Sequence, residues 1–222
     1  MEFCTVYYLE RNDGIQEEEL MNWVSVIPDT KRNRMKNSAI YPSQRERILA
    51  YMLLQYGLIR EYNLFYTPLI EKGEYGKPYF RDRGDICFNI SHCRAAVACG
   101  LSSDDIGVDV QHIAPYKEKT AAYFMTEEEL KGCPENEKDL YFTRLWSLKE
   151  SYVKYQGHGI FQPDRLHQIS VKEGSDPRGF QISSFAMDGY YMAVCGNMEP
   201  CIKKVSYEEL KEQFSLSFPK KL

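Results

Sequence analysis

The sequence predicts an α+β protein with two similar lobes, each a small antiparallel-type sheet packed on a long helix. Each half of the 222-residue chain contains one long helical pattern, at residues 43–61 and 137–156. Short strand patterns separated by turn residues accompany both helices. No Pro/Ser-rich linker separates the halves, so we expect one compact unit with the lobes in contact.

The first lobe is expected to span residues 1–105. Its long helix begins at a predicted capping box, Ser43 to Glu46, in which a serine and a glutamate three residues apart satisfy free N–H groups. Gly73 to Pro78 has the composition of a turn and precedes a predicted hairpin. The other elements are expected over residues 3–9 (strand), 16–27 (helix), 86–90 (strand) and 95–101 (strand).

The second lobe is expected to span residues 106–222. It opens with a strand over 106–110, and a short helix and a second capping box, Thr126 to Glu129, precede its long helix. Further strands are expected over 168–172, 179–185, 190–195 and 201–206.

Composition places the chain among folded proteins that do not span a membrane. Hydrophobic residues make up 43% and charged residues 27% of the sequence, which supplies enough apolar surface for a core. No apolar run reaches the roughly 20 residues of a membrane span, and Glu2 and Glu10 lie where a signal peptide has bases. A net charge of −4 argues against a nucleic-acid interface. We expect a cytoplasmic monomer that binds neither membranes nor nucleic acid.

One stretch departs from this acidic average. Between residues 31 and 47, six basic residues stand against a single acid, Glu46. Such a run is either a solvated helical face or a compact site for an anion, and the residues alone leave both interpretations open. The six bases are Lys31, Arg32, Arg34, Lys36, Arg45 and Arg47.

Asp109 needs a chemical explanation because it lies inside the apolar, β-branched strand 106–110. Gln111 follows on the same face of the strand two residues later. A buried carboxylate without a partner is costly. We therefore expect Asp109 to meet a cation, a metal ion or a set of N–H donors, an ion pair at the strand end being the simplest alternative.

Lys149 lies in the middle of the apolar arc of helix 137–156. An ammonium group there either extends to solvent or borders a cavity that holds an anion. Glu150 and Lys154 lie at the edge of the arc, and an ordinary i,i+4 ion pair is their simplest interpretation. Asp109 and Glu150 together indicate a hard divalent metal, beside lysines suited to phosphate oxygens.

Other kinds of site find little support. Ser91 and His92 end a strand, where sheets commonly present ligands, but no second histidine has metal-ligand spacing. The seven cysteines contain no C-x-x-C pair, which argues against a zinc ribbon. The P-loop, Rossmann, zincin and α/β-hydrolase motifs are absent from the sequence.

Five segments carry a family resemblance. FNISH (88–92), IGVDV (106–110) and WSLKESYVKYQGHGI (146–160) resemble, in order and spacing, the signature segments of the surfactin-synthetase-activating class of 4′-phosphopantetheinyl transferases. YGKP (75–78) and the basic stretch also match in place. The resemblance implies the pseudo-twofold fold of that family, with the active site between the lobes.

The resemblance further implies an activity. The phosphopantetheine arm of coenzyme A would be transferred to a serine of an apo acyl or peptidyl carrier protein, with release of adenosine 3′,5′-bisphosphate. Mg²⁺ is the implied cofactor. The chemistry would be an in-line displacement at the β-phosphorus, with Glu150 or a metal-bound water as the base.

The resemblance also implies roles for individual residues. Asp109, Glu150 and Gln111 would ligate the metal, and Lys154 and Lys149 would support the charge on the departing phosphate. The implied coenzyme A contacts are Lys31, Arg34 and Arg47 at the 3′-phosphate, Lys77, Ser91 and His92 at the adenosine diphosphate portion, and Lys154.

Gln111 departs from the family pattern, in which this position is often acidic. The missing negative charge is expected to weaken Mg²⁺ binding before the anionic pyrophosphate arrives, so metal and coenzyme A should bind cooperatively. Glu128 is expected to be a further acid near the site.

Two other classes of protein would use the same residues. A metal-dependent phosphohydrolase acting on a nucleotide would need Asp109, Glu150 and the lysines but no carrier. A non-enzymatic module that binds coenzyme A or a carrier protein would tolerate the loss of Glu150, and the neutral Gln111 keeps this alternative open.

Overall fold

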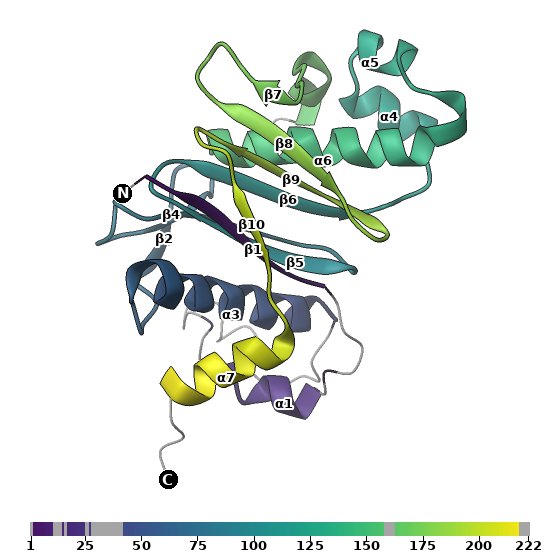
Figure 1. Ribbon diagram of the computed structural model, residues 1–222. Helices are drawn as coiled ribbons and strands as arrows, with labels where there is room; N and C mark the ends of the chain where they lie inside the picture. Colours follow the sequence, from purple (N-terminus) through teal and green to yellow (C-terminus); the bar gives the residue numbers. More distant parts are fainter. Residues whose placement is uncertain are drawn as a thin grey trace.

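Two four-stranded sheets lie face to face between two long helices, α3 (Pro42–Tyr62) and α6 (Lys138–Gln156) (Figure 1). The computed structural model describes residues 2–10, 15, 17–24, 27, 42–157 and 163–217. This architecture confirms the predicted α+β class. In the described part of the chain, no helix combines the length and the apolar composition needed to cross a bilayer.

The first sheet contains strands from both ends of the chain. Its strands are β1 (Cys4–Glu10), β4 (Cys87–His92), β5 (Ala96–Ser102) and β10 (Cys201–Lys204). β1 pairs with β5 antiparallel and with β10 parallel, and β4 forms the edge beyond β5. Side chains alternate along β1, so Tyr7 and Leu9 pack in the core with α3, while Cys4 and Val6 pack against the second sheet.

The second sheet is antiparallel throughout and carries α6 on its outer face. Its order is β6 (Ile106–His112), β9 (Tyr190–Gly196), β8 (Gln181–Ala186) and β7 (Gly174–Ser175). Ile106, Val108 and Val110 of β6 are buried between the two sheets. The alternating residues of β6, which include Asp109, therefore face α6.

The remaining elements are short apart from α7. The hairpin β2 (Ile70–Lys72) and β3 (Pro78–Phe80) encloses the predicted turn at Gly73 to Pro78. The capping box predicted at Thr126 is confirmed, because Thr126 and Glu129 each bond the other's backbone N–H. The other helices are α1 (Glu17–Met21), α4 (Glu118–Phe124), α5 (Glu127–Lys131) and α7 (Tyr207–Ser217), with 3-10 turns at Glu135–Glu137 and Pro163–Gln168.

A glycine sets how closely α6 approaches the second sheet. A Cβ atom on Gly107 would lie 1.9 Å from the carbonyl oxygen of Ser151, so no other residue fits there without moving the helix. The helix ends at Gly157, whose φ of 72° is the left-handed conformation that favours glycine at a helix C-terminus. This close packing places the middle of α6 directly over Asp109.

Side chains of β4 join the two lobes where the edges of the sheets meet. Asn89 Oδ1 accepts a hydrogen bond from Val108 N at 3.0 Å, and Ser91 Oγ accepts one from Val110 N at 3.1 Å. These two side chains satisfy backbone donors of β6 on the edge that carries no paired strand. The lobes thus meet beside Asp109.

The structure differs from the sequence expectations in four places. α3 begins at Pro42, so Ser43 lies inside the helix and is not its cap. Within the helix expected over 16–27, residues 17–24 and 27 are described, and of these Glu17–Met21 form an α-helix. No strand forms over 168–172, all of which are described. β10 and α7 pack with the first lobe, although residues 106–222 were expected to form the second. β10 completes the sheet beside β1, and Phe214 of α7, a helix that the sequence patterns did not predict, is buried in the core around α3.

Candidate active site

Two buried carboxylates meet between β6 and α6. The residues Asp109 and Glu150 are 6% and 5% exposed. Asp109 Oδ2 and Glu150 Oε1 are both buried and accept no hydrogen bond. The pKa of Glu150 is raised to about 7, mainly by burial and also by the nearby charge of Asp109, while the Lys154 ammonium acts in the opposite direction. Two adjacent acids with unpaired oxygens form a site that attracts a cation.

The other oxygen of Asp109 is fully engaged. Asp109 Oδ1 accepts hydrogen bonds from Lys154 Nζ at 2.7 Å and from Ser91 Oγ at 2.9 Å. Lys154 Nζ also donates to Ser91 Oγ and to the carbonyl oxygen of Val108, both at 3.0 Å. The carboxylate on β6 is thus held by one side chain of β4 and one of α6.

The donor set fits a hard divalent ion. Carboxylate oxygens are the ligands that Mg²⁺ and Ca²⁺ prefer, and each of the two acids offers an oxygen without a partner. Gln111 lies two residues beyond Asp109 on the same face of β6 and is half-buried. No group of three or more His, Cys, Asp or Glu side chains with metal-binding geometry occurs among residues 2–217 as far as they are described. A metal here would therefore have two protein carboxylates, with the neutral Gln111 as the next oxygen donor.

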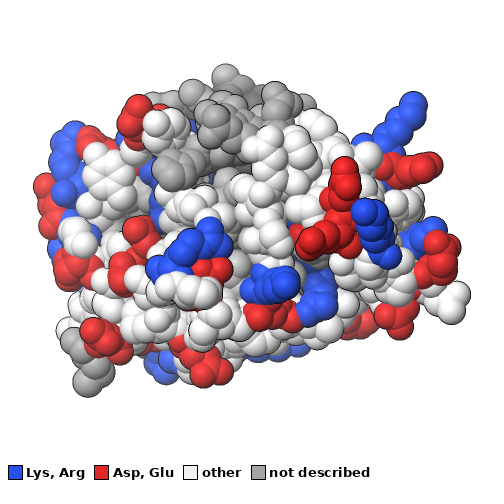
Figure 2. All heavy atoms as spheres, turned by 90° about the horizontal axis from the view of Figure 1, so that it is seen from above, with Lys and Arg blue, Asp and Glu red and all other residues white. Residues whose placement is uncertain are grey.

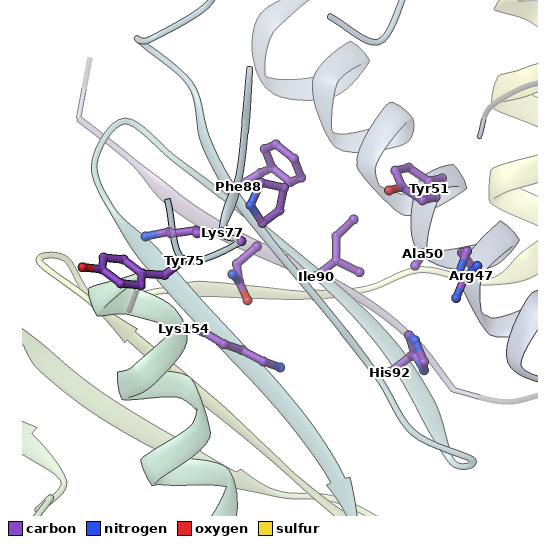
Figure 3. A pocket seen from close by; sticks show the side chains of 13 residues that line it. Arg47, Ala50, Tyr51, Tyr75, Lys77, Phe88, Ile90, His92 and Lys154 are labelled. Carbon is purple, nitrogen blue, oxygen red and sulfur yellow. The ribbon is translucent and has the colours of Figure 1, made fainter. Parts of the chain in front are cut away.

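A pocket of about 400 Å³ lies beside this pair, between the first turns of α3, the β2–β3 hairpin, β4 and the C-terminal end of α6. Four basic side chains line it, Arg47, Lys77, His92 and Lys154, each from a different element. Figure 3 shows Lys154 reaching from α6 beneath β4, with His92 and Arg47 at the same end of the pocket. The pocket is suited to a ligand that carries several negative charges.

Besides Lys154, which pairs with Asp109, two of these bases already have acidic partners. His92 Nδ1 lies 3.3 Å from Glu46 Oε2 of α3. Burial lowers the pKa of His92, whereas the Glu46 carboxylate raises it. Lys77 Nζ bonds Asp105 Oδ1 at 2.6 Å and the carbonyl oxygen of Tyr155 at 2.7 Å, which ties the hairpin to the end of α6.

Lys149 requires a correction. Its ammonium group was expected beside the phosphates, but the side chain is 1% exposed and points into the core of the second lobe. Lys149 Nζ bonds Glu129 Oε2 at 2.7 Å, Phe124 O at 2.6 Å and Leu166 O at 3.1 Å. These three acceptors use all the donors of an ammonium group, so Lys149 holds α5 and two neighbouring segments against α6.

The other predicted site residues divide into three groups. Lys31 and Arg34 lie outside the described residues. Glu128 is exposed on α5, and its neighbour Glu129 is the acid that reaches the interior. The structure brings the rest together around the acid pair and the pocket: Arg47, Lys77, Ser91, His92, Asp109, Gln111, Glu150 and Lys154.

Sequence reasoning missed Glu46 and Asn89 as parts of this region. Glu46 was interpreted as half of a capping box, although the single acid in a basic stretch is a signal for a charge partner. Asn89 lies two residues before Ser91, so the alternation of strand residues places both on one side of β4. The alternation of side chains along the segment FNISH could therefore have identified Asn89 as a neighbour of Ser91.

The face of the molecule in Figure 2 shows no large patch of a single charge sign. Basic side chains lie next to acidic ones on this face. Exposed pairs such as Arg178–Asp176 and Lys138–Glu135 are examples of such local compensation.

Comparison with known proteins places the chain in a group of related sequences. Residues 105–195 match the family model described as the 4′-phosphopantetheinyl transferase superfamily. The chain is 31% identical over 221 residues to the 4′-phosphopantetheinyl transferase Sfp of Bacillus subtilis (strain 168), covering 92% of this chain and 99% of that protein. It is 29% identical to the transferase ffp of Bacillus subtilis with the same coverage. With the transferase HetI of Nostoc sp. it shares 30% identity over 167 residues, 70% of this chain and 68% of that protein.

Proposed function

Because the chain belongs to the 4′-phosphopantetheinyl transferase superfamily and transfers the phosphopantetheine arm of coenzyme A to a serine of a carrier protein, we propose that Asp109 and Glu150 hold the Mg²⁺ ion of this transfer. The observation that carries the proposal is the pair of buried oxygens, Asp109 Oδ2 and Glu150 Oε1, that accept no hydrogen bond. Gln111 would complete the protein's share of the ligands. When bound, Mg²⁺ would neutralise charge on the pyrophosphate oxygens.

Coenzyme A would lie in the pocket beside the acid pair. Arg47 and His92 line one end and Lys77 lies on the hairpin side. We assign Arg47, with Lys31 and Arg34, to the 3′-phosphate, and Lys77 and His92 to the adenosine diphosphate portion. Basic groups suit phosphate oxygens because each bond is charge-assisted.

The transfer is an in-line displacement at the β-phosphorus of coenzyme A. The carrier serine oxygen forms a bond to this phosphorus, and the bond to the bridging oxygen breaks, so adenosine 3′,5′-bisphosphate departs with the electron pair. Lys154 lines the pocket next to Asp109 and would stabilise the charge on the departing phosphate. The serine proton needs an acceptor, and we assign this role to Glu150, the carboxylate that lies beside Asp109 and Lys154.

The carrier partner is assigned by the chemistry of the acceptor. An apo acyl or peptidyl carrier protein would present its serine at the junction of the lobes, where β4, β6 and α6 meet. We propose that a single copy of this chain, working as a monomer, carries out the reaction, since Asp109, Glu150 and Lys154 all come from one copy.

A product assay tests this function. Incubation with a fluorescent coenzyme A analogue, Mg²⁺ and a panel of apo-carrier proteins should label a carrier, and a carrier whose acceptor serine is changed to alanine should stay unlabelled. Gel fluorescence and detection of adenosine 3′,5′-bisphosphate provide the measurement. Release of free phosphopantetheine without any carrier would instead indicate a phosphohydrolase.

Gln111 makes the metal site dependent on coenzyme A. With one carboxylate fewer than a three-acid site, and with Lys154 on Asp109, the site carries little net negative charge before the pyrophosphate arrives. Isothermal titration should therefore show Mg²⁺ binding about 10-fold or more tightly with coenzyme A than without it. Gln111→Glu should reduce this difference by strengthening binding to the protein alone. Equal Mg²⁺ affinity of the wild-type protein in both titrations would contradict the prediction.

A further inference from the structure

The Ser91 hydroxyl group makes three hydrogen bonds across the junction of the lobes. It donates to Asp109 Oδ1 at 2.9 Å and accepts from Lys154 Nζ at 3.0 Å and from Val110 N at 3.1 Å. A serine hydroxyl has one proton to donate and two lone pairs. All three are used within the protein, so this hydroxyl group ties β4 to Asp109, to Lys154 and to the backbone of β6.

The same bonds determine which oxygen of Asp109 is available. Oδ1 accepts from Ser91 and from Lys154, while Oδ2 is buried and accepts no hydrogen bond. Each bond to Oδ1 is charge-assisted. The carboxylate is therefore held in one orientation, with Oδ2 left for the cation site shared with Glu150.

Ser91 is also absent from the wall of the pocket. Asn89, Ile90 and His92 of β4 line it, whereas the side chain of Ser91 is 6% exposed and turned to β6. This placement differs from the role that the family resemblance implied, in which Ser91 contacts the adenosine diphosphate portion of coenzyme A.

We propose that Ser91 is a positioning residue for the metal ligand Asp109, acting from the first lobe on a carboxylate of the second, and that it makes no contact to coenzyme A. The proposal rests on the metal site assigned under the proposed function. Groups that orient a metal ligand typically contribute about 10- to 100-fold to metal affinity. Removing the hydroxyl should therefore weaken the metal and leave coenzyme A unaffected.

Asn89 provides a matched control. It lies two residues before Ser91 on β4 and accepts a hydrogen bond from Val108 N at 3.0 Å, as Ser91 does from Val110 N. Asn89→Ala and Ser91→Ala therefore each leave one backbone donor of β6 without its side-chain partner. The hydrogen bond to Asp109 is lost in Ser91→Ala alone, since Asn89 makes no bond to Asp109 in the described structure.

The experiment measures two affinities for each variant. Mn²⁺ binding to protein saturated with coenzyme A is followed by the electron paramagnetic resonance of the free ion, and coenzyme A binding is measured by calorimetry in EDTA. Ser91→Ala should bind Mn²⁺ about 10-fold or more weakly than wild type and coenzyme A within about twofold. Asn89→Ala should keep the Mn²⁺ affinity. Ser91→Thr, which retains the hydroxyl, should restore it, and Ser91→Cys, a weak donor, should be intermediate.

Three outcomes would overturn the inference. Ser91→Ala could weaken coenzyme A in EDTA and leave Mn²⁺ unchanged, which would make Ser91 a ligand contact. Asn89→Ala could weaken Mn²⁺ as much as Ser91→Ala does, in which case the strand junction and not the hydroxyl would matter. Ser91→Ala could also match wild type in both titrations. If the wild-type protein itself takes up no Mn²⁺, the metal assignment fails as well, which distinguishes that failure from one confined to Ser91.

Discussion

Glu150→Gln is expected to lower kcat/KM for a carrier protein by about 10³-fold or more. The substitution keeps the shape of the side chain but removes one of the two negative charges assigned to the metal and the assigned base. The radioactive or fluorescent transfer assay measures the loss, with Glu127→Gln as the control because Glu127 is exposed on α5 and pairs with Lys131 there. Wild-type activity in Glu150→Gln would contradict the assignment of Glu150.

The same variant should change how the stability of the metal-free protein depends on pH. The folded pKa of Glu150 is raised from 4.5 to about 7, so the folded state holds a proton that the unfolded state has lost between these values. The stabilising contribution is complete below pH 4.5 and is lost as the pH rises through about 7. The loss is on the order of 3 kcal/mol.

A Gln amide does not titrate in this range, so the Glu150→Gln variant escapes the loss of stability that the wild-type protein suffers as the pH rises. In EDTA, the variant should therefore be more stable than wild type at pH 8, and the two proteins should differ less at pH 5. Thermal unfolding at the two pH values is the measurement. An equal fall in Tm from pH 5 to pH 8 in both proteins would show that Glu150 does not titrate in this range.

Lys149→Met is expected to destabilise the protein by about 3 to 5 kcal/mol, because removing one partner of a buried ion pair leaves the other charge buried. The Glu129 carboxylate would lose the bond to Lys149 Nζ, and Glu129 Oε1 is already buried without a partner. The carbonyl oxygens of Phe124 and Leu166 would lose a donor as well. Denaturant unfolding measures the change in the free energy of unfolding.

Two further variants distinguish the loss of the buried Lys149–Glu129 pair from the loss of a positive charge at an exposed position. Lys131→Met removes an exposed partner of Glu127 and should change stability little. Lys149→Met combined with Glu129→Leu should be less destabilised than Lys149→Met alone, since no unpaired charge stays buried. If Lys149→Met were as stable as wild type and bound coenzyme A more weakly, Lys149 would be a phosphate contact as the family resemblance implied.

Local sequence patterns predicted the elements that carry the site. The 3.6-residue period placed a helix over 137–156, close to the observed Lys138–Gln156. The apolar strand around Asp109 lies within β6, Ile106–His112. Both predictions succeeded because helical and strand periodicity depend on neighbours a few residues away. The need of Asp109 for a partner also followed from its surroundings alone.

The partners themselves depended on residues far apart in the chain. An i,i+4 pair with Glu150 was the simplest interpretation of Lys154, yet Lys154 bonds Asp109 and Ser91, 45 and 63 residues away. Lys149 was correctly recognised as an anomaly in an apolar arc, but its partner Glu129 lies on a separate short helix. A helical period gives the face on which a side chain lies and says nothing of what packs against it.

The amino-acid sequence by itself thus determined the α+β class, the two long helices, the strand that carries Asp109 and the family to which the motifs belong. Only the tertiary structure decided that β10 and α7 return to the first lobe, that Lys149 is buried in a structural ion pair, and that Ser91 uses all its hydrogen bonds on the second lobe. The physical reason is that periodicity and capping act within one or two turns of chain. Sheet-edge pairing and the burial of charges are settled instead by whichever distant segments the folded chain brings together.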